Sequence, residues 1–334
     1  MPPQPHDETV TEMRRRNVAD AKAEAPAPPA AEVIDPKTLY PSVPTVLFWN
    51  SVAAVRSSTL CALACIALNP LVVRVAGGFA SDFTAFMFLS LALHSGMILL
   101  GGAFFKAADT WHWFDEYKVV RPENSAPASA ESKSALLWKA VKFVLFYHIF
   151  VRVALYAGLW LLKPYPSIAD SGLSLADFPV LFAHFVVQHF AGEAFNYGFH
   201  WWCHKAPKAL SFGHGMHHEF EESEAITAEF SGMSELVVYT LISYMHTAHR
   251  PVIVHLCTIF IRVWENLECH SSFNFSSTWL SRIGLLYSHR VEIHDFHHMR
   301  PAAGCFGKAL LFDLLFGTAD DFLVHKKKLN EPLF

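Results

Sequence analysis

The sequence predicts an all-α membrane protein, a polytopic helical bundle that carries a histidine-rich helical cap. Three observations support this fold class. Hydrophobic residues make up 52% of the 334 residues and charged residues only 17%, which is unusual for a soluble domain. Several apolar stretches reach the roughly 20 residues that a hydrocarbon core requires. Thirteen of the 20 histidines lie between His200 and His298.

The first forty residues differ from the rest of the chain. Residues 1–40 are rich in proline, alanine and charge, contain Arg14-Arg15-Arg16, and have no apolar periodicity. This composition predicts a disordered tail. The first apolar stretch begins too late for a cleavable signal peptide and is long enough to serve as a signal anchor.

Five apolar stretches are candidates for membrane insertion: residues 46–73, 83–105, 136–162, 175–199 and 236–263. The last is divided by His249-Arg250-Pro251 into two half-length pieces, which predicts a re-entrant hairpin. We therefore expect about four spans plus this hairpin. Arg152 lies near a span end, where its side chain could reach the headgroups, but charged residues inside spans are also often functional.

The spans suggest a division of the chain and an orientation. We expect N-terminal transmembrane helices and a linker over residues 41–174, a histidine-rich domain over 175–325, and a basic C-terminal tail over 326–334. Lysine and arginine near span ends favour the cytosolic side. An even number of spans would then place both tails and the histidine clusters in the cytosol.

The histidines follow two near-copies of one pattern, H-x3-H with H-x2-H-H, then a second H-x2-H-H. Spacings of three and four residues put imidazoles on one helix face, and imidazole binds iron, zinc and copper. Two such helical clusters can hold two ions. Together with one imidazole after the last apolar segment, the predicted metal ligands are His200, His204, His214, His217, His218, His270, His294, His297 and His298.

Other polar residues are given lesser roles. Isolated histidines on apolar helices, such as His184 and His255, are expected to bond backbone or to line a polar pocket. Glu219, Glu268 and Asp295 could orient ligand imidazoles or be solvated. The six cysteines include no CxxC pair, which argues against a thiolate zinc site. A net charge of −4 without interleaved basic and aromatic residues gives no reason to expect nucleic acid.

At these residues the chain resembles the membrane fatty acid hydroxylase/sterol desaturase superfamily of di-iron enzymes, most closely the C-4 methylsterol oxidases, over about residues 193–318. The histidine patterns look like the three boxes of that family. H-S-S-F-N-F-S, from His270, resembles the H-S-G-Y-[DN]-F-P segment of methylsterol oxidases and cholesterol 25-hydroxylase-like enzymes. F-D-L-L-F-G-T at 312–318 resembles their W-D-x-[IL]-F-G-T.

Several positions depart from the family pattern. Trp201 replaces the arginine that usually follows the first histidine, and Ser272 replaces the glycine of H-S-G-Y. Gly232-Met233 stands where methylsterol oxidases have His-Pro in A-E-Y-A-H-P-x-E. His289 is an extra imidazole with no family counterpart and is outside the predicted ligand set.

The resemblance implies a fatty acid hydroxylase-type di-iron domain at 175–325, with two iron ions and O2 as co-substrate. It implies a mixed-function oxidase that hydroxylates an unactivated C–H bond of a sterol, foremost the C-4 methyl group in sterol biosynthesis. No catalytic side chain is expected apart from the metal ligands. The sequence has no flavin, nicotinamide or cytochrome b5 motif, so the family's donors, cytochrome b5 and its NAD(P)H-dependent reductase, are implied as partners in the endoplasmic reticulum membrane.

Other functions stay open at this point. Within the superfamily, sterol side-chain hydroxylation, fatty-acyl hydroxylation and desaturation are alternatives. An inactive lipid-binding relative is another, although the ligand set is intact. A membrane metal transporter or storage protein would place its ligands within the spans, whereas these clusters follow span ends.

Overall fold

The computed structural model describes residues 34–119, 130–206, 208–286 and 290–330. The predicted N-terminal tail therefore lies almost entirely outside the described residues, as do His289 and the last four residues of the predicted C-terminal tail. Residues 36–334 form one compact unit. Its described part is helical without a strand, apart from an isolated antiparallel bridge between Lys118 and Phe273, so the all-α prediction is confirmed.

Three described helices are long and apolar enough to cross a membrane, and they match the first three predicted spans. They are α2 (Val43–Ala76), α3 (Asp82–Thr110) and a continuous helix over Lys133–Leu162. The third comprises α4 (Ala130–Phe146), the π-helical turn η3 (Tyr147–Val151) and α5 (Arg152–Leu162). Hydroxyl groups cap the first two: the side chains of Ser42 and Ser81 accept hydrogen bonds from backbone N–H groups three residues on, as helix starts favour.

The fourth predicted span does not meet the same criterion. Residues 175–199 fall within η4 (Leu175–Asp177) and the 28-residue helix α6 (Phe178–Lys205), but α6 is not among the candidate spans. Polar side chains along α6, including Gln188, Glu193 and Asn196, lower its hydropathy. The described residues thus contain three candidate spans where the sequence predicted four.

The predicted division of the last apolar stretch is present. It forms α8 (Met233–Thr247) and α9 (Val252–Cys269), which pack against each other and are separated by a turn that contains His249-Arg250-Pro251. Proline at position 251 cannot extend α8, because it lacks the N–H that a helix interior needs. Neither helix is a candidate span.

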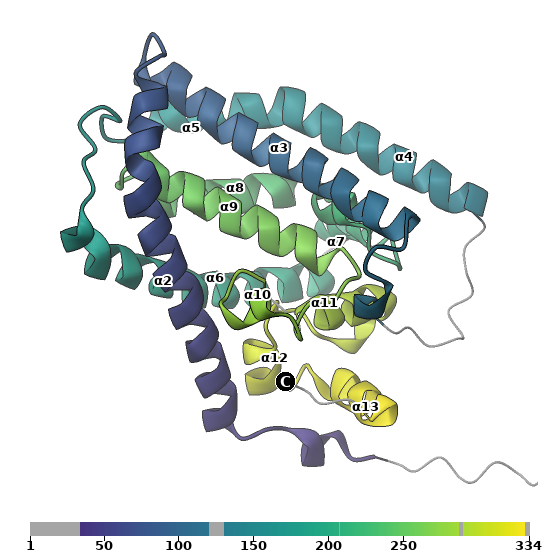
Figure 1. The fold of residues 1–334 in the computed structure, drawn as a ribbon. Coiled ribbons are helices and arrows are strands. Elements are labelled where there is room, and N and C mark those ends of the chain that lie inside the picture. The colour runs from purple at the N-terminus through teal and green to yellow at the C-terminus, as the bar shows by residue number, and fades with distance from the viewer. Residues whose placement is uncertain (1–33, 120–129, 207, 287–289, 331–334) are drawn as a thin grey trace, which may run out of the picture. The chain divides into compact units, whose positions relative to one another are not determined.

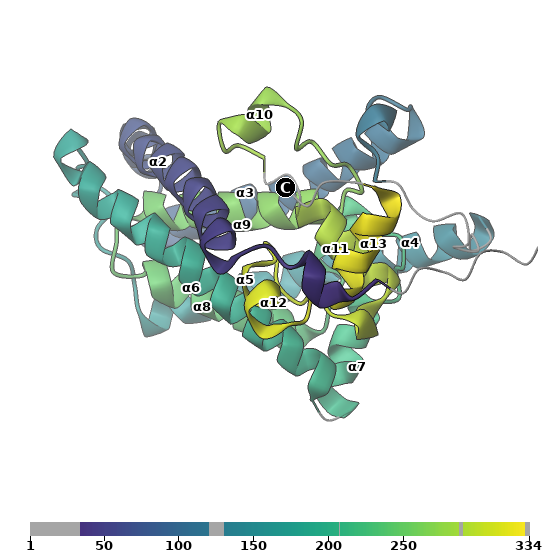
Figure 2. The same ribbon diagram turned by 90° about the horizontal axis from the view of Figure 1, so that it is seen from below.

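The longer helices are arranged around α9 (Figure 1). α3 lies along α9, and α2 packs on both α6 and α9. Seen from below, α6 runs across the unit with α12 against it and α11 and α13 beside them (Figure 2). The shorter elements are η1 (Pro36–Leu39), η2 (Asp115–Tyr117), α7 (Lys208–His217), η5 (Ala225–Glu229), α10 (Trp279–Arg282), α11 (Arg290–Met299), η6 (Pro301–Ala303), α12 (Leu311–Phe316) and α13 (Asp320–Leu329).

A buried charge network fixes η5 against the membrane helices. The carboxylate of Glu229 accepts a hydrogen bond from Arg152 Nη2 at 2.7 Å. His94 Nε2 and His148 Nε2 also lie 2.7 and 2.8 Å from its two oxygens. Burial would raise the pKa of Glu229, but Arg152 and His94 hold it well below its usual range, so the group stays ionised. Arg152 is 1% exposed and turns inward rather than toward the headgroups.

A close backbone contact joins α7 to the start of α8. A Cβ atom built on Gly232 would lie 2.6 Å from the Cα of Gly213, a distance that side-chain-bearing residues do not tolerate. Gly232 is one of the positions that depart from the family pattern, and this contact explains why a side chain is absent there. The approach sets the position of α7, which carries His214 and His217.

We predict that Glu229→Gln destabilises the protein, because the amide leaves the Arg152 charge buried without a counter-ion. Breaking a buried ion pair typically costs about 3–5 kcal/mol, so the melting temperature in detergent should fall by several degrees. Glu224→Gln is the matched control, since Glu224 pairs with Lys106 where both side chains are 28–42% exposed. A shift no larger than that of the control would contradict the role of the network.

A second prediction concerns the glycine contact. Gly232→Ala should push α7 away from α8 and destabilise the fold by about 1–3 kcal/mol, the usual range for overpacking. Gly215 lies inside α7, and a Cβ atom added there meets no atom within 4 Å. Gly215→Ala should therefore be neutral or stabilising, because alanine favours a helix more than glycine does. Thermal unfolding of both variants tests the pair, and equal effects would refute the contact.

Candidate metal centre

The structure brings the nine predicted histidines together in two groups of ring nitrogens. Within each group, one nitrogen from every residue lies within 4.8 Å of the others. The five-nitrogen group consists of His200, His204, His214, His218 and His297, and the four-nitrogen group of His217, His270, His294 and His298.

Each H-x2-H-H pattern contributes to both groups. His214 and His218, four residues apart, belong to the five-nitrogen group, while His217 between them belongs to the other. The second pattern is reversed, with its outer pair in the four-nitrogen group and His297 in the five-nitrogen group. The sequence predicted that two helical clusters can hold two ions, without assigning each histidine to an ion. Residues three and four apart on a helix point in slightly different directions, so each cluster supplies both groups.

Four helices deliver these side chains. The last turns of α6 carry the H-x3-H pair, and α7 with the residue after it carries the first H-x2-H-H. α11 carries the second H-x2-H-H, and His270 is the residue that caps the C-terminus of α9. The site is therefore assembled from segments that are far apart in the sequence.

The Nε2 atoms face one another at short range. In the five-nitrogen group, His204 Nε2 lies 3.0 Å from His214 Nε2 and 3.1 Å from His297 Nε2. In the four-nitrogen group, His294 Nε2 lies 2.9 Å from His270 Nε2 and 3.1 Å from His298 Nε2. If metal–nitrogen bonds are roughly 2.1 Å long, neighbouring ligands at right angles are about 3.0 Å apart. The observed separations match this value.

The opposite ring nitrogens have acceptors, and this fixes the tautomers. Backbone carbonyl oxygens accept hydrogen bonds from Nδ1 of five of the nine histidines, and the carboxylate of Glu235 lies 3.1 Å from Nδ1 of a sixth, His214. A carbonyl oxygen cannot donate, so these Nδ1 atoms carry the proton and Nε2 keeps its lone pair. The five carbonyl pairs are His200 with Phe306 at 2.7 Å, His217 with Phe230 at 3.3 Å, His270 with Asn266 at 2.7 Å, His297 with Gly304 at 2.7 Å, and His298 with Phe220 at 2.9 Å.

Where both tautomers are fixed, the facing lone pairs repel because neither nitrogen has a proton to share: His217 Nε2 lies 3.1 Å from His270 Nε2 and 3.2 Å from His298 Nε2. Protonation does not relieve this repulsion near neutral pH. Burial, with neighbouring imidazoles, holds the pKa of His200 and His298 well below the usual range, and burial lowers the pKa of His217 to about 4. A cation in each group would bind the lone pairs directly. The donor chemistry of both groups therefore fits a metal ion.

The loop after η6 orients the imidazole rings of His200 and His297. Asp313 is buried and accepts hydrogen bonds from the N–H groups of Phe306 and Gly307, both at 2.8 Å. The hydroxyl of Thr318 donates to the same carboxylate at 2.6 Å. These bonds hold the carbonyls of Gly304 and Phe306 in place for His297 and His200. The aspartate and threonine of the F-D-L-L-F-G-T segment thus position metal-facing histidines from a distance.

η5 orients two rings of the four-nitrogen group. Phe230, directly after η5, offers its carbonyl to His217. The carbonyl of Ala228 accepts from the side chain of Asn266 at 2.8 Å, and the carbonyl of Asn266 accepts from His270. The Glu229 network described above therefore lies directly behind this group.

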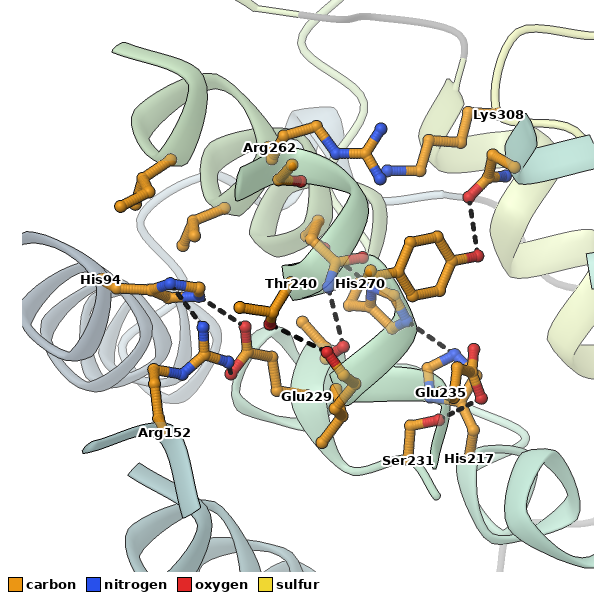
Figure 3. A pocket seen from close by; sticks show the side chains of 18 of the residues that line it. His94, Arg152, His217, Glu229, Ser231, Glu235, Thr240, Arg262, His270 and Lys308 are labelled. Atoms are coloured by element: carbon orange, nitrogen blue, oxygen red, sulfur yellow. Dashed lines mark hydrogen bonds and ion pairs between the residues drawn. The ribbon is translucent and has the colours of Figure 1, made fainter. Parts of the chain in front are cut away.

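A cavity of about 120 Å³ adjoins both groups; we call it the α9 cavity. Figure 3 shows His217 and His270 at one side of it and His94 and Arg152 at the other. Between them lie apolar side chains such as Ile259 and Val263. The cavity thus leads from the imidazole groups into the apolar interior.

Sequence reasoning missed several residues that shape the site. Glu235 accepts hydrogen bonds from His214 and from Ser231. It is the last residue of the segment 228–235 that was compared with A-E-Y-A-H-P-x-E, and this match is the signal that could have found it. Of the acidic residues considered earlier, Glu219 pairs with Lys139, and Glu268 and Asp295 are fully buried.

The sequence is similar to one protein-family model and to enzymes of known function. Residues 181–318 match the family model of fatty acid hydroxylases. Methylsterol monooxygenase 1 of Gallus gallus is 24% identical over 193 residues, 57% of this chain and 64% of the relative. The same enzyme of Rattus norvegicus is 23% identical over 202 residues, 58% of this chain and 66% of the relative. The match thus spans just under two thirds of each relative, and no solved structure matches the chain.

The matched region contains every histidine of the two groups. It also contains the five backbone carbonyls that accept hydrogen bonds from these imidazoles, from Phe220 to Phe306. Over residues 181–318 the chain is therefore similar to the fatty acid hydroxylases, and across more than half of its length it is similar to methylsterol monooxygenases.

Proposed function

We propose that this protein is a membrane-bound di-iron mixed-function oxidase that hydroxylates an unactivated C–H bond of a sterol, using O2 and external electrons. The observation that carries the proposal is the convergence of nine imidazole Nε2 atoms in two groups beside one cavity. Imidazole donors suit iron as well as zinc and copper. We propose iron as the bound metal because the members of the similar family are iron-dependent.

The proposed ligands are the nine histidines of the two groups. Bound iron would supply the O2 chemistry that amino-acid side chains lack. The chain's own part is to hold the imidazoles neutral and correctly turned, through the carbonyls around Asp313 and η5 and through Glu235. The apolar side chains in the wall of the α9 cavity, among them Leu236, Ile259 and Val263, would contact the lipid. We assign no other side chain as an acid or base.

The C-4 methyl group is the carbon that we propose first, because the relatives are named methylsterol monooxygenases. The segments at His270 and at residues 312–318 also resemble those of C-4 methylsterol oxidases. Sterol side-chain hydroxylation, and fatty-acyl hydroxylation or desaturation, are the alternatives within the superfamily. We further propose cytochrome b5 and its reductase as electron donors, and an endoplasmic reticulum location with the histidines facing the cytosol.

Lipid profiling tests reaction and substrate together. Cells that lack the gene would be compared by mass spectrometry with cells restored by wild type or by His217→Ala. Accumulated 4-methyl or 4,4-dimethyl sterols that only wild type removes would support C-4 oxidation. Loss of a different hydroxylated or desaturated lipid would move the substrate, and an unchanged lipid profile would favour an inactive lipid-binding relative.

We predict that His217→Ala and His297→Ala each remove one of two bound metal ions, since the residues belong to different groups. Turnover should fall by at least about 100-fold, because even residues that only orient metal ligands change activity by 10–100-fold. Metal analysis of the purified variants measures the first effect. His246→Ala is the control, as His246 lies in neither group; metal loss in that variant would show the assignment of ligands to be wrong.

The buried imidazoles also predict how stability depends on pH. An unfolded histidine has a pKa near 6.5, while burial lowers the pKa of His217 to about 4. Between these values the unfolded state binds more protons, so stability falls as pH decreases. Metal-free protein should therefore keep its melting temperature above about pH 6.5 and lose it progressively toward pH 4. His217→Gln should flatten this slope, and a wild-type melting temperature that stays constant from pH 7.5 to 5 would disprove the argument.

A further inference from the structure

One buried histidine outside both groups has an unpartnered nitrogen in the wall of the α9 cavity. His255 is 1% exposed and lines the cavity. Its Nε2 forms no hydrogen bond to any residue that the structure describes. A buried polar atom left without a partner costs about 1–3 kcal/mol, and such atoms are rare in native proteins. In a cavity wall, this nitrogen marks a place for a ligand atom.

His255 lies at the end of the cavity remote from the imidazole groups. The cavity follows one face of α9, since His255, Ile259, Val263, Asn266 and His270 all line it at spacings of three or four residues. Fifteen residues separate His255 from His270. At 1.5 Å per residue, this corresponds to about 22 Å along the helix, so His255 is well separated from the imidazole groups.

The ring of His255 is prepared for a hydroxyl group. Its Nδ1 lies 3.2 Å from the hydroxyl oxygen of Thr247, which in turn lies 2.6 Å from the hydroxyl of Tyr165. If the hydroxyl of Thr247 donates to Nδ1, Nε2 of His255 carries the ring proton and is a donor. If Nδ1 instead donates to Thr247, Nε2 is an acceptor. A hydroxyl group can satisfy both states, because it donates and accepts.

The surroundings favour a neutral and otherwise apolar ligand. The rings of Phe86 and Tyr244 lie with their centroids 5.5 and 5.8 Å from that of His255. The charges of the neighbouring network, Arg152 and Glu229, bond each other. No unpaired charge is left there among the described residues that would attract an anion or a cation.

We propose that the His255 end of the α9 cavity binds a hydroxyl group of the lipid substrate, an inference that rests on the proposed function. The hydroxyl has two possible sources. If it is the ring hydroxyl of a sterol, the side chain lies at the imidazole groups, and the oxidised carbon is then on the side chain and not at C-4, which neighbours the hydroxyl-bearing carbon. If it lies on the side chain, the sterol ring and its C-4 methyl group lie there.

Equilibrium binding tests this assignment without turnover. The full-length, iron-loaded protein in nanodiscs, without an electron donor, is titrated with three tritiated sterols. These are cholesterol, cholest-5-ene without a hydroxyl, and cholest-5-ene with a hydroxyl only on the side chain. Wild type should bind one hydroxylated sterol about five- to tenfold more tightly than cholest-5-ene, the ratio expected for one hydrogen bond to a buried group. The preferred sterol identifies the source of the hydroxyl.

Three variants make the test specific. His255→Leu should abolish the difference in affinity, while His255→Gln, which keeps a hydrogen-bonding group, should retain part of it and also serves if the leucine variant does not fold. His189→Leu is the matched control, because its Nε2 is also buried without a partner but it lines a separate cavity. Its affinities should equal those of wild type.

The results separate this inference from the proposed function. Equal wild-type affinities for the three sterols, no binding of either hydroxylated sterol, or discrimination that persists in His255→Leu would overturn the hydroxyl site. Metal content should not change in His255→Leu, since His255 belongs to neither group. If wild type discriminates between the sterols but oxidises none of them, the hydroxyl site stands and the proposed oxidase function fails.

Discussion

The structure depends on one electrostatic constraint, the mutual repulsion of imidazole lone pairs that point at common centres. Nine Nε2 atoms approach their neighbours to about 3 Å, and the acceptors behind the rings prevent most of them from turning the proton inward. Only a cation makes such an arrangement favourable. Without one, the repulsion must be offset by the packing around the site, so we expect metal binding to contribute directly to the stability of the cap.

The surrounding fold supplies rigid acceptors for that purpose. Asp313 holds the loop that faces His200 and His297, and the Glu229 network holds η5 behind His217. The Gly213–Gly232 contact fixes α7 against α8. These three sets of contacts come from different parts of the chain. Each of them fixes the position of a backbone segment that orients or carries a metal-facing imidazole. Carbonyl groups orient rings well because their own positions are set by the helix or loop that contains them.

Much of the site could be predicted from the sequence, because its signal is local. Spacings of three and four residues predict a shared helix face, and the position of His270 directly after the last apolar segment adds a ninth imidazole. The assignment of each histidine to a group could not be predicted, since it depends on how α6, α7, α9 and α11 meet. The same holds for Glu229 and its partners: His94, His148 and Arg152 come from two membrane helices, and only their packing brings them to one carboxylate. Residues 175–199 were predicted as a span from their many apolar residues, but polar side chains such as Gln188 and Glu193 lower the mean hydropathy of α6, so that it is not a candidate span.

The two groups differ in a way that bears on the chemistry. An ion held by four imidazoles would keep more free positions than one held by five, so the four-nitrogen group is the one better suited to the proposed reaction. The same group is oriented by η5, and η5 also forms a wall of the α9 cavity through Ala228 and Glu229. A ligand in the cavity would therefore contact the segment that orients His217 and, through Asn266, His270. The cavity and the orientation of these two imidazoles are thus linked through one backbone segment.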